Sequence, residues 1–277
     1  MTPAIVSESR VESDRFGLRI GRVHVGADVD VGQLESACSG FDVVILRCAA
    51  TEVDLPYRLR GLRDFRAFTA DHLSIWRWEV GEPGPIVLPD GWSVGLSTDA
   101  GAVADVVRDA FADYRNHYRA NPLFDASAAL DVYVDWAHTL MARSDDACTV
   151  VCDPTGDEVG VALVDWNDEV PDIKLAGIRR RAQGRGRYGA LVSYVMGLAV
   201  DRSSPALTIS TQSHNVNVMR AWSRLGFLPV DTLVTMHLVR GELLDDWAAT
   251  AGTGGRTLDP TGSVAPVASA PVESPPT

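Results

Sequence analysis

A glycine-rich loop with five arginines, residues 179–187, lies between two apolar segments and constrains the fold more than any other feature. Residues 173–178 have the composition of a buried strand, and residues 190–200 fit a helix. Glycine lets backbone N–H groups approach an anion closely, and a following helix adds the partial positive charge of its N-terminus. The segment therefore predicts a strand, an anion-binding loop and a helix in succession.

The acidic composition of the chain limits what such a loop can bind. The 277 residues include 37 Asp and Glu against 25 Lys and Arg, which gives a net charge of −12 and a pI near 4.9. A surface for nucleic acid or an anionic membrane needs basic residues spread over a wide area. We therefore expect a local anion site, and neither nucleic acid nor a membrane as a partner.

The cysteines and the N-terminal residues predict a compartment. Cys38, Cys48, Cys148 and Cys152 form no C-x-x-C pair, and the last two fit buried strand positions better than metal ligands. The first residues lack the cationic and apolar segments of a signal peptide, and no apolar stretch has membrane-spanning length. These features predict a reduced, cytoplasmic protein without a metal site.

Changes in composition along the chain suggest three parts. The segment Gly81-Glu-Pro-Gly-Pro85 can continue neither a helix nor a sheet ladder, so we place a domain boundary there. This gives a first domain of residues 1–82 and a second of residues 92–241. Residues 248–277 are dominated by Pro, Ala, Ser, Gly and Thr, and we expect a disordered tail because so little apolar area can be buried.

Periodicity predicts a mixed α/β fold for the second domain. The expected helices are residues 99–118, 126–143, the segment after the loop up to residue 201, and 216–225. The expected strands are residues 147–152, 159–166, 173–178, 207–211 and 233–239. In the first domain, residues 16–25, 42–48 and 67–80 have strand composition, the last as one bent strand or a pair.

Two common nucleotide-binding motifs compete for the glycine-rich loop. A P-loop is excluded because the chain has no G-x-x-x-x-G-K-[ST] segment. Gly184, Gly186 and Gly189 match the G-x-G-x-x-G spacing of dinucleotide-binding folds, but no acidic residue ends a strand about 20 residues later. Dinucleotide binding is therefore the weaker interpretation of the loop.

Two linked motifs resemble those of the GNAT superfamily of acyl-CoA-dependent N-acyltransferases. The family's pyrophosphate loop is [Q/R]-x-x-G-x-[G/A]; Gln183 and Gly186 match it, whereas Tyr188 replaces the final small residue. The second motif, N-x-x-A-x-x-[LAV]-Y-x-x-x-G-F, is matched by Asn215 and by Gly226-Phe227. The motifs have the family's order and spacing, and the resemblance covers residues 92–241.

The resemblance implies a GNAT fold, a central mixed β-sheet flanked by helices, with acetyl-CoA or another acyl-CoA as cosubstrate. The strand before the loop would hold the pantetheine arm, the loop would wrap the pyrophosphate, and Arg179 and Arg181 would point to solvent. The residues expected to bind the cosubstrate are Ala176, Gly177, Ile178, Arg180, Gln183, Gly184, Arg185, Gly186, Arg187, Tyr188, Gly189, Asn215, Asn217 and Trp222.

The resemblance leaves the proton-transfer groups open. In many relatives a tyrosine four residues before the final Gly-Phe protonates the departing CoA thiolate, but Trp222 stands there, and an indole N–H is not a useful acid. Tyr188, His214 or water could donate instead, the enzyme could run another acyl-CoA reaction, or the domain could bind CoA without turnover. The candidate bases for the amine are His117, Tyr118, Asp172 and His214, whereas His237 fits a core position.

These features predict an acetyl-CoA-dependent N-acetyltransferase that acts on the primary amine of a small molecule, such as an amino sugar or a specialised metabolite. Attack would be direct, in a ternary complex, and a homodimer is compatible with the sequence. A CoA-sensing module and a nucleotide-dependent oxidoreductase are the alternatives. Residues 41–78 parallel residues 206–238, through duplication or convergent β-α-β patterning. A degenerate GNAT-like half before a complete one resembles the layout of dTDP-fucosamine acetyltransferases.

Overall fold

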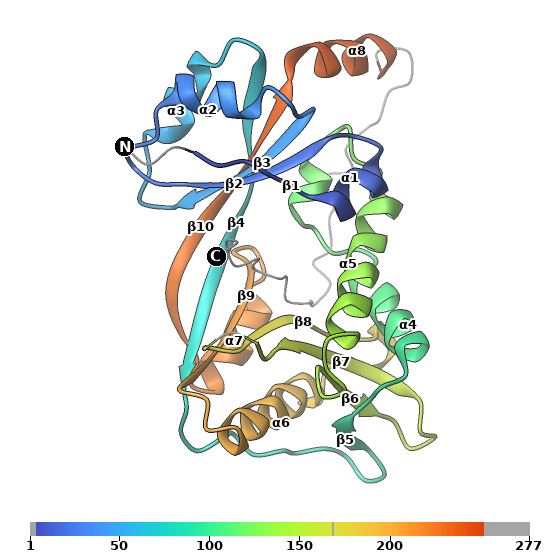
Figure 1. Ribbon diagram of the computed structural model, residues 1–277. Coiled ribbons are helices and arrows are strands. Elements are labelled where there is room, and N and C mark those ends of the chain that lie inside the picture. The colour runs from blue at the N-terminus through green and yellow to red at the C-terminus, as the bar shows by residue number, and fades with distance from the viewer. Residues whose placement is uncertain (1–3, 168, 252–277) are drawn as a thin grey trace. The chain divides into compact units, whose positions relative to one another are not determined.

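The computed structural model describes residues 4–167 and 169–251 (Figure 1). The strands are β1 (Ser7–Glu8), β2 (Ile20–Val25), β3 (Val43–Ala49), β4 (Phe65–Glu79), β5 (Ser93–Leu96), β6 (Cys148–Cys152), β7 (Glu158–Asp165), β8 (Asp172–Ile178), β9 (Ala206–Gln212) and β10 (Leu228–Arg240). The α-helices are α1 (Arg10–Phe16), α2 (Val31–Cys38), α3 (Leu55–Arg58), α4 (Ala100–Phe111), α5 (Ala126–Met141), α6 (Arg187–Asp201), α7 (Val216–Arg224) and α8 (Gly241–Ala251). Short 3-10 helices are η1 (Leu59–Gly61), η2 (His117–Ala120) and η3 (Arg180–Ala182).

The chain forms two compact units that alternate along the sequence. Among the described residues, the first unit holds residues 4–73, 115–132 and 232–251, and the second holds 74–114 and 133–231. Strands β4 and β10 and helix α5 each have one part in either unit. The units change at residue 74 rather than at the predicted boundary near residue 82, because β4 has residues in both units.

The first unit is built on a mixed sheet with the strand order β1-β2-β3-β10-β4. Strands β2 and β3 are parallel, and β10 runs antiparallel to β3. Helices α2 and α3 supply buried leucines to an apolar cluster on one face, together with alternate residues of β3 and β10. The cluster is built around Leu34, Leu55, Val44, Leu46, Met236 and Leu238.

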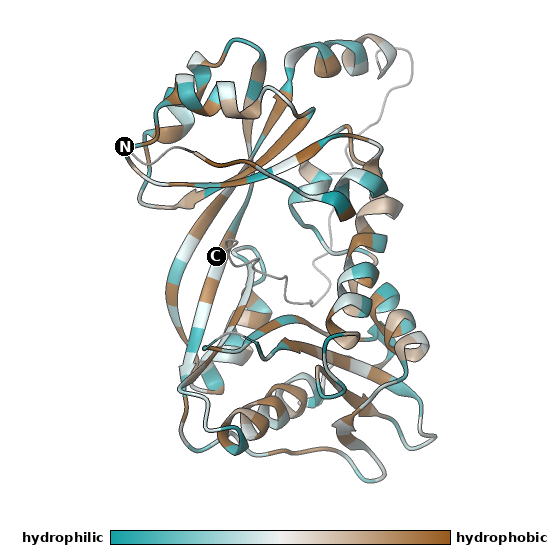
Figure 2. Ribbon diagram, in the orientation of Figure 1, coloured by the Kyte–Doolittle hydropathy of each residue, from teal (hydrophilic) through white to brown (hydrophobic). Residues whose placement is uncertain are grey.

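The second unit contains the strand order β4-β9-β8-β7-β6-β5, in which β5 to β8 are antiparallel neighbours and β8 is parallel to β9. Ala162 and Val164 of β7 face an apolar cluster formed with α6 and α7. Because side chains alternate along a strand, Val161 and Leu163 face the opposite side, where α4 contacts β7 and β8. Figure 2 shows the hydrophobic residues that run along β7. The predicted mixed α/β fold is confirmed.

Strands β8 and β9 pair at two positions, at the start of β8 and at the third and fourth residues of β9. Asp172 lies opposite Thr208 and Ile173 lies opposite Ile209, although each strand is seven residues long. On its other side β8 stays paired with β7 up to its last residue, Ile178, which lies opposite Gly160. The two parallel strands therefore part along most of their length, just before the arginine-glycine loop.

Two sequence predictions need correction at the ends of elements. The helix expected over residues 99–118 ends at Phe111, because Asn116 has an extended backbone and its side chain accepts hydrogen bonds from the first N–H groups of η2. The strand expected from residue 16 starts at Ile20, because α1 precedes it and is closed by Gly17 at φ +65°. Residues 67–80 form one strand, β4, as one of the two alternatives predicted.

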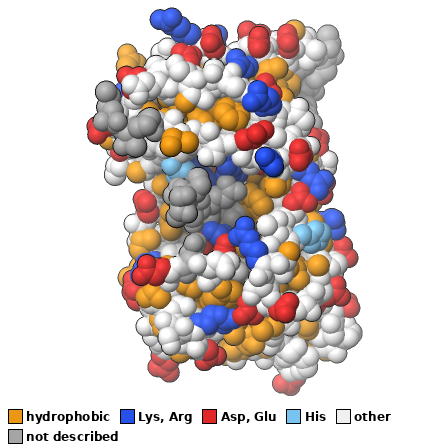
Figure 3. Space-filling view, viewed as in Figure 1, with side chains coloured by type: hydrophobic (Ala, Val, Ile, Leu, Met, Phe, Trp, Pro, Cys, Tyr) orange, Lys and Arg blue, Asp and Glu red, His pale blue; other side chains and the backbone are white. Residues whose placement is uncertain are grey.

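Several predictions concern the surface and the ends of the chain. The predicted tail, residues 248–277, lies outside the described residues except for 248–251, which end α8. No helix in the described part is both long and apolar enough to cross a membrane. On the face shown in Figure 3, acidic and basic side chains are interspersed.

Candidate functional site

The loop between β8 and α6 has an unusual backbone. Gly184, Arg185 and Gly186 have φ values of +81°, +54° and +78°, so three consecutive residues are left-handed. A Cβ at Gly184 would meet no atom within 4 Å, and one at Gly186 would lie 3.9 Å from the carbonyl oxygen of Val87. Glycine accepts this backbone without strain, whereas Arg185 carries a cost of about 1–2 kcal/mol. The loop thus leaves open space beside a strained main chain.

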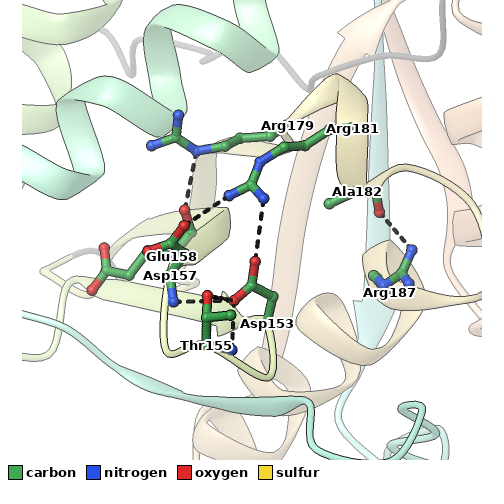
Figure 4. Close-up of polar contacts among 8 residues, drawn as sticks. All are labelled: Asp153, Thr155, Asp157, Glu158, Arg179, Arg181, Ala182 and Arg187. Atoms are coloured by element: carbon green, nitrogen blue, oxygen red, sulfur yellow. Dashed lines mark hydrogen bonds and ion pairs between the residues drawn. The ribbon is translucent and has the colours of Figure 1, made fainter.

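Two of the five arginines are tied to the β6–β7 turn (Figure 4). Arg179 donates from Nε to the carbonyl oxygen of Glu158 at 3.0 Å. Arg181 forms ion pairs with Asp153 and Asp157 at 3.3 and 3.2 Å. The sequence predicted solvated side chains here; Arg181 is indeed exposed, and such pairs contribute little to stability.

The loop's remaining exposed arginines differ in what they contact. Arg180 donates its backbone N–H to Asp109 at 2.9 Å, and its guanidinium pairs with Asp113 at 2.6 Å. Arg185 is exposed and makes no ion pair or hydrogen bond within the described part of the chain. Arg180 was predicted to bind the cosubstrate, but its charge is already engaged by carboxylates. Arg185 is the better candidate to meet an anion.

Arg187 was predicted to bind the cosubstrate, but its side chain is held within the protein. Its side chain is buried, it donates from Nη1 to the carbonyl oxygen of Ala182 at 2.9 Å, and its guanidinium carbon lies 3.7 Å from the centre of the Trp92 ring. Figure 4 shows the contact with Ala182 across the loop. Gln183 holds the other end by donating to the carbonyl oxygen of Ile178 at 3.1 Å. The loop is therefore fastened on both sides.

The segment interpreted as a domain boundary packs against α6. A Cβ at Gly84 would lie 3.0 Å from Oγ of Ser193 on α6 and equally close to Leu225, so the main chain there touches the helices directly. Trp92, at the end of this segment, contacts the guanidinium of Arg187 with the face of its ring. Sequence reasoning missed this role because the prolines and glycines of residues 81–85 resemble an ordinary linker.

The other predicted cosubstrate residues lie around the same loop. Ala176, Gly177 and Ile178 form the buried end of β8, beyond the point where β9 parts from it. Gly189 lies in the first turn of α6, where a Cβ would meet nothing within 4 Å. Asn217 lies exposed in the first turn of α7.

A chain of hydrogen bonds joins the end of β9 to the start of α7. Asn215, the N-cap of α7, is buried and donates from Nδ2 to Thr211 Oγ1 at 2.7 Å. The hydroxyls of Thr211 and Tyr114 lie 3.1 Å apart, and Tyr114 donates to the side chain of Gln212. Asn215 thus fixes this corner through its side chain. Sequence analysis did not single out Tyr114, because periodicity marked it only as one more apolar helix position.

Trp222 and Tyr188 form a pair between α7 and α6. Trp222 is fully buried and donates from Nε1 to the hydroxyl oxygen of Tyr188 at 3.0 Å. The ring of Trp76 meets Trp222 edge-on at 6.0 Å between centroids. Because an indole N–H can only donate, the hydroxyl of Tyr188 accepts from it and directs its own proton elsewhere. The two motif departures, at positions 188 and 222, are therefore partners.

The four candidate bases fall into both units. Asp172 and His214 belong to the second unit, whereas His117 and Tyr118 belong to the first. Asp172 is buried at the start of β8, pairs with Lys174 at 2.9 Å and accepts from Thr208 at 3.0 Å. It lies six residues before the end of β8, roughly 20 Å along the strand. These contacts favour a structural role for Asp172.

Tyr118 is fully buried in a charged cluster of the first unit. Its hydroxyl donates to Glu12, and Arg22 donates to the same hydroxyl at 3.2 Å. Burial alone would raise the pKa of Glu12, but its ion pair with Arg22 and the hydrogen bonds lower that pKa overall. The phenol is thus committed to a carboxylate.

His117 is held by a hydrogen-bond sequence that fixes its tautomer. Asn121 accepts from the N–H of Leu123, so its amide group donates to Nδ1 of His237 at 3.1 Å. A neutral His237 therefore carries its proton on Nε2 and donates to Nδ1 of His117 at 3.0 Å. This occupies the lone pair that a base needs. The arrangement favours a structural role for His117 and confirms that His237 is a core residue.

No family model matches the chain. Over 145 residues it is 22% identical to the spore coat polysaccharide biosynthesis protein SpsD of Bacillus subtilis (strain 168), covering 52% of this chain and 49% of SpsD. The chain thus spans about half the length of this relative.

Solved structures resemble the chain over most of its length. A GCN5-related N-acetyltransferase from Sphaerobacter thermophilus aligns with a TM-score of 0.60 at 15% identity, over 86% of this chain and 76% of that one. Another, from Kribbella flavida, gives 0.53 at 15% identity, over 81% and 84%. The chain has the GCN5-related N-acetyltransferase (GNAT) fold. The fold expected from the two motifs is confirmed.

Within the GNAT fold the buried histidine pair makes stability depend on pH. Burial lowers the pKa of His237 to about 3, and burial together with His237 holds the pKa of His117 well below its usual range. Unfolded histidines bind a proton below about pH 6.5, while the folded pair stays neutral, so the unfolded state binds more protons as the pH falls. Between pH 7 and 5, each is expected to remove about 2 kcal/mol from the free energy of unfolding.

Urea unfolding at pH 7 and pH 5 checks this expectation. His237→Gln keeps a donor and an acceptor but cannot titrate, so it should lose about half of the pH effect. His72→Gln changes an exposed histidine of the first unit and should keep all of it. An unchanged pH effect in His237→Gln would refute the neutral pair.

Among the candidate bases of this GNAT fold, His214 has the most suitable environment. It is exposed, belongs to the same unit as the arginine-glycine loop, and directly precedes Asn215. Asp172, His117 and Tyr118 are all buried. No group of three or more His, Cys, Asp or Glu side chains is arranged to hold a metal in residues 4–167 and 169–251.

Proposed function

We propose that the protein is an acyl-CoA-dependent N-acyltransferase, with acetyl-CoA as the leading cosubstrate. The observation that carries the proposal is the order of three elements in the second unit: a strand that separates from its neighbour, a left-handed loop and a helix. Strand β8 parts from β9 after Ile173 and is followed by η3, by the left-handed residues 184–186 and then by α6. A separated strand edge suits an extended amide-bearing arm, and a left-handed loop before a helix suits a diphosphate.

The residues present fit such a cosubstrate. The open space at Gly184 and Gly186 allows phosphate oxygens to approach the main chain, and the exposed Arg185 supplies charge. Backbone groups of residues 176–178 would hold the pantetheine arm. When bound, an acyl-CoA supplies an activated thioester. The sequence match to the family's loop supports this placement independently of the backbone.

Proton transfer would use residues of the same unit. We assign removal of the ammonium proton of the amine to His214, because it is the exposed candidate. We assign the proton for the leaving thiolate to Tyr188, whose hydroxyl already accepts from Trp222 and so donates away from it. A thiol needs little help as a leaving group because its pKa is near 8.5, so Tyr188 would assist rather than determine the rate.

The proposed acceptor is the primary amine of a small molecule, with amino sugars as the first class to test. Two observations support this class. The partial relative SpsD is named for polysaccharide biosynthesis. The sequence also resembles that of dTDP-fucosamine acetyltransferases in its layout, a degenerate GNAT-like half before a complete one. Direct attack of the amine on the thioester is the proposed route.

A turnover assay tests the proposal. The purified protein is incubated with acetyl-CoA, or with longer acyl-CoAs, and a panel of amines that includes nucleotide-linked amino sugars, while free thiol is followed. We expect thiol release that depends on the amine, and we expect CoA rather than NAD(P) to raise the melting temperature. CoA binding without thiol release across the panel would favour a CoA-sensing module. Stabilisation by NAD(P) alone would favour an oxidoreductase.

A further inference from the structure

We propose that Arg187 and Trp92 form a clasp that holds the loop in its anion-receiving conformation, and that Arg187 acts by positioning rather than by contact with phosphate. The proposal rests on the proposed function for the identity of the ligand, a diphosphate-bearing acyl-CoA. It assigns different roles to the two arginines that flank Gly186. Arg185 meets the anion, and Arg187 fixes the backbone around it.

The geometry of Arg187 matches a clasp. Its Nη1 reaches back five residues to the carbonyl oxygen of Ala182, so one hydrogen bond bridges the segment that contains the left-handed residues 184–186. Its guanidinium carbon lies over the Trp92 ring, 3.7 Å from the ring centre. The side chain is only 6% exposed, and its Nε has no acceptor in the described part of the chain. A carbonyl and a ring therefore hold this cation.

The loop needs such a fastening because its backbone is strained. Arg185 is left-handed at φ +54°, a conformation that persists only where the surrounding structure enforces it. Ala182, at the start of the loop, is buried in the cluster that contains α6 and α7. Gln183 ties the strand end through Ile178, so Arg187 supplies the second tie that keeps residues 184–186 left-handed.

The base of the clasp is itself fixed. Trp92 precedes β5, and the segment before it touches α6 closely at Gly84. Val87 of this segment places its carbonyl oxygen 3.9 Å from the Cβ position of Gly186. The segment thus packs against the loop at Gly186, and its Trp92 ring contacts the guanidinium of Arg187. A contact assembled from two distant parts of the chain is more consistent with positioning than with a mobile ligand-binding arm.

The conservative substitution Arg187→Lys separates positioning from direct contact. Lysine keeps the charge and binds phosphate well, but it lacks the planar fork that both reaches Ala182 and stacks on Trp92. A clasp predicts that Arg187→Lys weakens acetyl-CoA binding about tenfold and leaves binding of S-acetylpantetheine, which has no diphosphate, unchanged. Trp92→Leu should have the same effect, and the double variant should be no worse than either single one.

Limited trypsin digestion provides a second measurement that needs no ligand. Cleavage after the exposed Arg185 should accelerate about tenfold in Arg187→Lys and in Trp92→Leu, because the loop opens more often. Arg181→Lys alters an exposed ion pair with the β6–β7 turn, away from the left-handed residues 184–186, and should leave this rate unchanged. Cleavage is followed by mass spectrometry of the new peptide end.

The outcomes are distinguishable. An unchanged cleavage rate after Arg185 in Arg187→Lys would overturn the clasp. Additive losses in the double variant, or equal losses for acetyl-CoA and S-acetylpantetheine, would also overturn it. If the parent protein fails to bind acetyl-CoA, the proposed function is wrong, and the digestion still decides whether Arg187 and Trp92 hold the loop.

Discussion

Replacing Gly186 with aspartate is expected to weaken CoA binding by roughly a hundredfold or more, about 2.7 kcal/mol. Gly186 has φ +78°, so any side chain there adds strain of about 1–2 kcal/mol. The new carboxylate would also lie where the proposed diphosphate binds, and like charges repel strongly at short range. Isothermal titration of CoA into the parent and Gly186→Asp proteins measures the loss.

Two further variants separate the causes of that loss. Gly186→Ala adds the backbone strain without the charge and should weaken binding about tenfold. Gly197→Asp adds a carboxylate to the same helix at a position without positive φ and with open space for a Cβ, and should bind CoA as the parent does. Parent-like affinity in Gly186→Asp would show that the anion site lies elsewhere.

Truncating Trp222 to alanine is expected to lower the free energy of unfolding by about 3–5 kcal/mol. The indole is fully buried among residues of β8, β9, α6 and α7, so its removal leaves a large cavity in the core of the second unit. The hydroxyl of Tyr188 also loses its donor. Urea unfolding followed by far-UV circular dichroism measures the change.

The controls for Trp222 compare exposure and ring size. Trp247→Ala removes an indole of α8 that is 40% exposed and should cost much less. Trp222→Phe keeps an aromatic ring in the core, so it should retain the fold and slow turnover only modestly. A complete loss of turnover in a folded Trp222→Phe protein would contradict the view that the indole transfers no proton.

Local sequence was sufficient to predict the strand, the loop and the helix around residues 173–201. Glycine has a direct physical meaning at Gly184 and Gly186, where the backbone is left-handed. The sequence also predicted that Asn215 lies at the start of α7, because the second family motif follows the loop at the expected spacing. These features depend on residues close in sequence or on a rigid order of elements, and periodicity carries that information well.

The contacts of each arginine side chain could not be predicted, because the partners lie far away along the chain. Arg187 stacks on Trp92, and Arg180 pairs with Asp113, both from segments that precede β6. A run of like charges gave the impression of one anion-binding cluster. In the structure, carboxylates, carbonyls and a ring of the described part of the chain engage every arginine of the loop except Arg185.

Burial was the other quantity that sequence could not supply. His117 lies at the end of the predicted helix 99–118, and its residue type suits acid-base chemistry, so it was a candidate base. Its contacts with His237 and, through it, Asn121 come from β10 and from the end of η2, and they occupy the nitrogen a base would use. Whether a histidine is a base or a core residue depends on such contacts rather than on its neighbours in sequence.

Strands β4 and β10 each have residues in both units, and this limits how the protein can be divided into fragments. Strand β4 pairs with β9, and its residues 74–79 belong to the same unit as the arginine-glycine loop. A recombinant fragment of residues 92–241 would therefore lack a central strand and expose the edge of β9, which invites aggregation. The loop and its helix are not a portable module: a fragment that carries them must also include β4, which precedes the predicted boundary at residue 82.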